Sequence, residues 1–89
     1  MRNEKEKVLK EELRVLAIRT RDNLKITQRE MGRKLEMSES SYSDIETGES
    51  MCGTLTAILL LGLQPNPCEF INSTLSKFQK LYEKEMRTA

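Results

Sequence analysis

Apolar side chains recur at three- and four-residue steps along much of the chain, which is the spacing of amphipathic helices. The first stripe predicts a helix over residues 3 to about 22. It consists of Val8, Leu9, Leu13, Leu16 and Ala17. No segment alternates apolar and polar residues as a half-buried strand does. The pattern therefore predicts an all-α protein.

Two short helices are predicted in the middle of the chain by the residues that begin them. Thr27 and Glu30 have the spacing of a capping box, in which each side chain bonds a free backbone N–H of the other residue. This box predicts a helix over 28–35. Ser38 is a favourable N-cap for a second helix over 39–47.

These two helices are separated by three residues, 36–38, and the second ends at Gly48. Glycine readily takes the left-handed conformation that follows a helix. Two short helices joined by so tight a turn are typical of a helix-turn-helix, which places its second helix against double-stranded nucleic acid.

The last two predicted helices differ in character. The segment 54–61 contains five consecutive apolar residues, so we expect this helix to be buried on most sides. After a proline-containing connector, Pro67 can open a helix over about 67–86. Its apolar seam has coiled-coil-like spacing and consists of Ile71, Leu75, Phe78 and Tyr82.

We therefore expect two parts in a chain of 89 residues. Residues 1–65 would form a helix-turn-helix domain of four helices, and 66–89 a C-terminal helix for packing or dimerisation. In one interpretation the seam folds back to cover the apolar residues 58–61. In the other it forms a homodimer interface, which would set the spacing of two DNA half-sites near one helical turn.

Charge is segregated along the chain, although the formal net charge is only +1. Residues 1–34 carry eleven Lys or Arg and six Asp or Glu, a net charge of +5. Residues 35–76 carry six acids and no Lys or Arg, a net charge of −6, and residues 77–89 carry +2. The acidic block covers the second helix of the predicted motif, where a DNA-binding protein usually has basic residues.

Composition argues against enzymatic and metal-dependent functions. The chain has no histidine, which is the commonest general base, and no glycine-rich phosphate loop. Cys52 and Cys68 alone cannot supply the four ligands of a structural zinc site, so we expect no metal and no cofactor. With no apolar segment long enough to cross a bilayer, we expect a cytoplasmic protein with reduced cysteines.

Residues 17–63 resemble the phage-repressor/Cro-type helix-turn-helix domain of the XRE family on the pattern TQxExGxxLxMSxSxYSxIExG. The resemblance implies a five-helix lambda-repressor-like helix-turn-helix domain with a long C-terminal helix. It also implies a repressor-like protein that regulates transcription by sequence-specific DNA binding, with 39–47 in the major groove.

The resemblance assigns roles to particular residues. Gln28 matches a glutamine that contacts the DNA backbone, whereas Glu39, Ser40 and Asp44 match positions that reach base edges. The candidate DNA-binding residues are Thr27, Gln28, Arg29, Arg33, Glu39, Ser40, Ser41, Ser43 and Asp44. Arg21 and Glu46 match a partly buried ion pair of the family.

Two chemical points bear on these roles. A carboxylate at Glu39 or Asp44 can accept a hydrogen bond from cytosine N4. Arg29 and Arg33 lie four residues apart, which fits phosphate contacts and fits a solvated helix face equally well. The chain also departs from the family at the turn, where Glu36 replaces the usual glycine.

The acidic block leaves a second function open. The helix-turn-helix could serve as an adaptor, antitoxin or anti-repressor whose acidic face binds a basic protein. The alternatives are thus a DNA-binding regulator acting as a dimer and a protein-interaction module.

Overall fold

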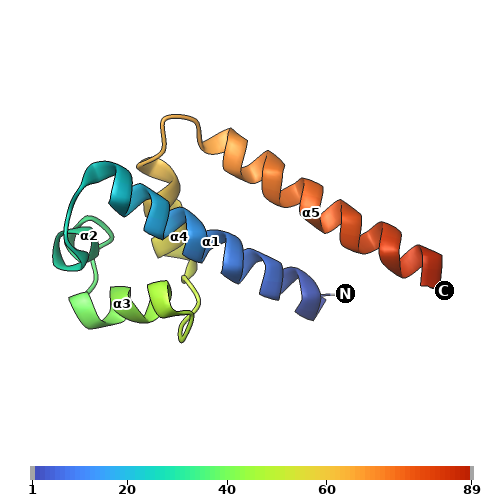
Figure 1. Cartoon of the computed structure of the whole chain (residues 1–89), viewed down its shortest axis with the longest axis horizontal. Coiled ribbons are helices and arrows are strands. Elements are labelled where there is room, and N and C mark those ends of the chain that lie inside the picture. The colour runs from blue at the N-terminus through green and yellow to red at the C-terminus, as the bar shows by residue number, and fades with distance from the viewer. Residues whose placement is uncertain (1, 89) are drawn as a thin grey trace.

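The computed structural model describes the backbone of residues 2–88 and the side chains of residues 2–84. Residues 1 and 89, which end the two predicted parts 1–65 and 66–89, lie outside this range. The elements are α1 (Arg2–Leu24), α2 (Gln28–Lys34), α3 (Glu39–Thr47), α4 (Thr54–Gly62) and α5 (Pro67–Thr88). The predicted all-α fold with a long C-terminal helix is confirmed (Figure 1).

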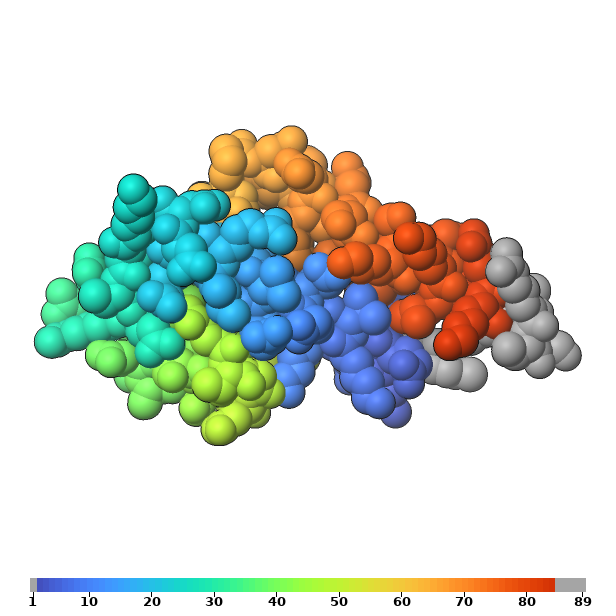
Figure 2. All heavy atoms as spheres, viewed as in Figure 1, coloured from blue at the N-terminus to red at the C-terminus, as the bar shows by residue number. Residues whose placement is uncertain are grey.

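The long helices α1 and α5 run in opposite directions, so the two ends of the chain lie at the same end of the molecule (Figure 1). The short helices α2 and α3 form the other end, and α3 also packs against α1. The space-filling view shows α2 and α3 as one exposed end, in cyan to green (Figure 2). This end is therefore free to approach a large partner.

One apolar core joins the first four helices. Its buried members are Leu13, Leu16, Ala17, Met31, Leu35, Tyr42, Ile45, Cys52 and Leu60. Tyr42 is fully buried, and its hydroxyl donates to the backbone oxygen of Ala17 at 3.3 Å. Because a buried hydroxyl without a partner is costly, this bond helps to fix α3 on α1.

The turn between α2 and α3 depends on close backbone contact. Gly32 is buried, and a Cβ at this position would lie 2.9 Å from the Met37 oxygen and 3.2 Å from the Ser38 oxygen. Glu36 has φ +57°, a left-handed conformation that costs a non-glycine residue about 1 kcal/mol. Gly48 ends α3 with φ +85°, as its sequence position predicted.

The expectation that α4 is buried on most sides is wrong. Thr56 and Leu60 face the core, but Leu55 is 65% exposed and Ile58 is 61% exposed. A helix with apolar residues around its whole circumference needs neighbours on every side, and α4 has them on one side only. Its outer face is apolar and uncharged.

Helix α5 folds back on α1, but not through its predicted seam. Phe70 packs against the core and Thr74 is buried, whereas Ile71, Leu75 and Tyr82 are 43%, 55% and 52% exposed. Phe78 is half-buried. The interpretation in which all four seam residues cover 58–61 is therefore wrong.

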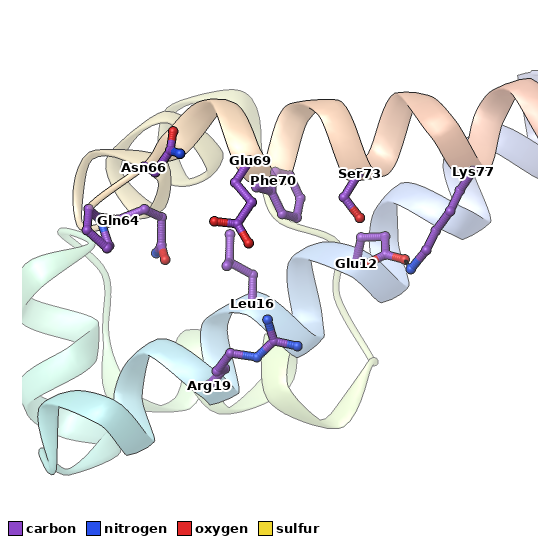
Figure 3. Close-up of a pocket in the computed structure, with 10 residues that line it drawn as sticks. Glu12, Leu16, Arg19, Gln64, Asn66, Glu69, Phe70, Ser73 and Lys77 are labelled. Carbon is purple, nitrogen blue, oxygen red and sulfur yellow. Dashed lines mark hydrogen bonds and ion pairs between the residues drawn. The ribbon is translucent and has the colours of Figure 1, made fainter.

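Polar contacts line the joint between α1 and α5. Lys77 forms an ion pair with Glu12, and the Gln64 amide donates to Thr20 Oγ1 at 2.9 Å and to the Leu60 oxygen at 3.0 Å. Between them lies a pocket of about 240 Å³, in which Arg19 and Glu69 line opposite walls (Figure 3). Within the described residues, no helix is both long and apolar enough to span a membrane.

Candidate nucleic-acid interface

Helix α3 turns one side to the core and the other to solvent. Tyr42 and Ile45 are buried, whereas Glu39 and Ser40 are exposed and Asp44 is partly exposed. This orientation follows from the sequence, because the two apolar residues are three apart and the polar residues occupy the remaining faces. The outer side lines an open hollow between α3 and the start of α2, formed by Gln28, Ser38, Glu39, Ser40, Ser43 and Asp44.

Capping bonds hold the two helix starts beside this hollow. The Glu30 backbone N–H donates to Thr27 Oγ1 at 3.1 Å, and the Thr27 N–H donates to Glu30 Oε1 at 3.4 Å, so the predicted capping box is confirmed. Ser38 caps α3 by accepting from the Ser41 N–H at 3.1 Å. The Ser38 hydroxyl also donates to the Ser41 hydroxyl at 2.9 Å.

Glu46 is the centre of a network that joins three helices. Arg21 Nε lies 2.6 Å from Glu46 Oε2 and Arg21 Nη2 lies 3.2 Å from Glu46 Oε1, a two-point ion pair between α1 and α3. The Tyr42 hydroxyl also bonds this carboxylate. Gln28 Nε2, at the start of α2, donates to Glu46 Oε1 at 3.1 Å.

The network shifts the protonation of its members. Burial alone would raise the pKa of Glu46, but hydrogen bonds from Arg21, Tyr42 and Gln28 outweigh it and hold this pKa below its ordinary value of 4.5. Burial and the bond to Glu46 raise the pKa of Tyr42 above its ordinary value of 10.0. Glu46 therefore stays ionised and Tyr42 stays protonated at neutral pH.

The basic residues near α2 are exposed and available. They are Lys25, Arg29, Arg33 and Lys34. Within the side chains that the structure describes, none of the four has an ion-pair partner or a side-chain hydrogen bond. Cations left unpaired on a helix next to the exposed face of α3 can contact phosphate.

The carboxylates of α3 are equally unpaired. Neither Glu39 nor Asp44 forms a side-chain hydrogen bond or ion pair with another residue in the described range. They do not gather with other donors into a metal site, since residues 2–84 contain no group of three or more His, Cys, Asp or Glu side chains suited to a metal ion. The exposed end thus combines basic α2 with acidic α3.

Comparison with known families identifies this arrangement. A family model described as helix-turn-helix matches residues 18–62, about half of the chain, from the second half of α1 to the end of α4. The chain belongs to this family, in its XRE/Cro-type form, so its kind of function is that of a DNA-binding transcription regulator. Neither the curated proteins nor the solved structures include a match to the chain.

Some features of the site have no signal in the sequence. Gln28 and Glu46 are eighteen positions apart, and nothing local to either residue indicates their bond. The role of the Tyr42 hydroxyl is equally hidden, because Tyr42 reads from the pattern as an ordinary core residue. Both contacts depend on the angle at which α2 and α3 meet.

Proposed function

We propose that the chain is a sequence-specific transcriptional regulator that lays α3 in the DNA major groove. The observation that carries this proposal is the outward polar face of α3, anchored from behind by Tyr42 and Ile45, in a chain of the helix-turn-helix family. The short side chains of Ser40 and Ser43 allow α3 to approach base edges closely. Glu39 and Asp44 reach further and supply hydrogen-bond acceptors.

Phosphate contacts in this proposal come from the α2 side of the interface. Arg29 and Arg33 share one face of α2, and Lys25 and Lys34 lie at its two ends. These residues supply the attraction that is independent of sequence, while the acids on α3 reduce it. We therefore expect weak binding to random DNA and a need for two copies to reach useful affinity.

Dimerisation is proposed through the exposed apolar side of α5. Ile71, Leu75 and Tyr82 lie on this side, and Leu75, Phe78 and Tyr82 line one surface hollow. Leu55 and Ile58 of α4 add to the exposed apolar surface. Single-chain proteins rarely expose apolar patches larger than a few hundred Å², and a two-fold contact between copies would cover these side chains.

The test of the proposed function is selection of bound duplexes from a random library at moderate salt. A regulator enriches a defined sequence, and a dimer enriches two related half-sites about one helical turn apart. Anisotropy titrations with the selected duplex and a scrambled one then measure specificity. Absence of any enriched sequence, with equal affinity for both duplexes, contradicts the proposal.

A protein-interaction module is the second candidate, and the acidic side of the motif favours it. Glu39 and Asp44 are unpaired within a segment, 35–76, that has no Lys or Arg. The double variant Glu39→Ala, Asp44→Ala separates the two functions. In a regulator it changes the selected DNA sequence, whereas in an interaction module it abolishes binding to a basic protein and the parent chain binds no duplex.

A further inference from the structure

The orientation of the Gln28 amide is fixed by chemistry. An ionised carboxylate only accepts hydrogen bonds, so the contact of 3.1 Å with Glu46 Oε1 must use the Gln28 amide nitrogen. Turning the amide over would place two oxygens against each other. Gln28 Oε1 is therefore the atom without a partner among the described residues, and Gln28 lines the hollow between α2 and α3.

Glu46 cannot easily release this amide. Its two oxygens are held by the Arg21 guanidinium and by the Tyr42 hydroxyl, and Tyr42 is fully buried. The Glu46 side chain is itself only 9% exposed. Groups held in this way keep their direction before a ligand arrives, so binding does not have to order them.

The groups that face the hollow are then mostly acceptors. Gln28 contributes Oε1, and Glu39 and Asp44 contribute carboxylates. The Ser38 hydroxyl is already engaged with Ser41, and the hydroxyls of Ser40 and Ser43 can donate or accept. No Lys, Arg or Asn side chain lines this hollow.

Acceptors in the protein require donors on the DNA. In the major groove only cytosine N4 and adenine N6 carry donor hydrogens, whereas guanine and thymine present acceptors there. We infer that this hollow selects the exocyclic amino groups of cytosine and adenine, and that Gln28 reads a base edge with them rather than a phosphate. The inference rests on the proposed function and names the part of the DNA that the same site recognises.

The direct test removes amino groups from the selected duplex one at a time. Cytosine is replaced by 2-pyrimidinone and adenine by purine, each of which lacks the exocyclic amino group. At contacted positions we expect binding about tenfold weaker or more. Replacing guanine by 7-deazaguanine, which removes an acceptor instead, is the matched control and should leave the affinity unchanged.

Protein variants test the assignment of Gln28. A base-reading Gln28 predicts that Gln28→Ala relaxes the preference at one base position and leaves the salt dependence unchanged. A phosphate-binding Gln28 predicts that all duplexes lose affinity by the same factor. Thermal unfolding of Gln28→Ala, followed by circular dichroism, shows whether the fold is retained.

A second pair of variants separates base reading from charge. Glu39→Gln keeps the size of the side chain, removes one negative charge and adds a donor, so it should tolerate an acceptor base where the parent chain does not. Glu49→Gln removes the same charge from an exposed residue outside the hollow and should strengthen binding without changing the selected sequence.

The outcomes distinguish this inference from the function on which it rests. Selected sites with guanine at the contacted positions, or amino-group replacements without effect, would overturn the inference while leaving a DNA-binding regulator intact. A chain that binds no duplex but binds poly-lysine, whose ammonium groups are also donors, overturns both.

Discussion

Arg21 donates to Glu46 through two guanidinium nitrogens, at 2.6 and 3.2 Å, and thereby joins α1 to the last turn of α3. The Arg21 side chain is 24% exposed and that of Glu46 9%. Arg21 Nη1 also donates to the Ile26 oxygen at 3.2 Å, which fixes the chain between α1 and α2. One pair of charges therefore positions all three helices that build the exposed end.

Removing the carboxylate should destabilise the whole domain. Glu46→Ala leaves Arg21 partly buried without its partner and removes acceptors from Tyr42 and Gln28, so we expect a loss of about 3 kcal/mol in the free energy of unfolding. Urea denaturation followed by circular dichroism measures this loss. Glu49→Ala, which removes an exposed acid three residues away, should change stability by less than about 0.5 kcal/mol.

The same carboxyl makes stability depend on pH on the acid side. Burial raises the pKa of Glu46, but its hydrogen bonds lower it further, so the folded pKa lies below the ordinary value of 4.5. Such a group stabilises the fold above its unfolded pKa, and this contribution is lost as pH falls through the folded pKa. Denaturation midpoints should therefore fall below about pH 4.5 more steeply in the parent chain than in Glu46→Gln. Parallel pH profiles of the two proteins would contradict this.

Close approach at Gly32 gives a test of the turn that does not involve charge. A Cβ there would meet two backbone oxygens at 2.9 and 3.2 Å, and backbone cannot move aside as a flexible side chain can. We expect Gly32→Ala to cost about 1–3 kcal/mol. Gly62→Ala is the control, because nothing lies within 4 Å of its Cβ and α4 gains a better helix former there. A Gly32→Ala variant as stable as Gly62→Ala would show that α2 and α3 do not meet this closely.

Local signals were sufficient to predict much of the fold. The capping box at Thr27, the N-cap at Ser38 and the C-cap at Gly48 are formed by residues at most three positions apart, so a sequence displays them directly. The stripe of α1 likewise predicted which of its residues enter the core. These features depend on local bonds and on helical periodicity, both of which can be read without knowing the tertiary fold.

Features that depend on how helices pack were predicted less well. The apolar segment of α4 indicates a buried helix, yet Leu55 and Ile58 remain exposed because no fifth helix covers that side. The seam of α5 has ideal spacing, but the helix is rotated so that Phe70 and Thr74 face α1. At the site, the sequence placed Glu39 and Asp44 on the motif but gave no sign that Glu46 holds Gln28.

Self-association should depend on the exposed side of α5. Leu75→Ser should lower the dimer fraction, measured by sedimentation equilibrium, without unfolding the chain, because the leucine is already 55% exposed. Leu24→Ser is a matched control, since Leu24 is 44% exposed at the end of α1, away from α5. A dimer that resists Leu75→Ser but is weakened by Ile58→Ser would place the interface on α4 instead.

Salt dependence should report the balance between basic α2 and acidic α3. Each neutralised phosphate contributes about 0.9 to the slope of log affinity against log salt, so a dimer with four contacts per copy has a slope of about −7 at most. The double variant Arg29→Gln, Arg33→Gln should reduce this slope by roughly half, because two of the four contacts in each copy are lost. Lys10→Gln with Lys80→Gln removes the same charge from α1 and α5 and should leave the slope nearly unchanged. Anisotropy titrations of one selected duplex over a range of salt concentrations give all three slopes. An unchanged slope in the arginine double variant would assign Arg29 and Arg33 to a solvated helix face and move the phosphate contacts elsewhere.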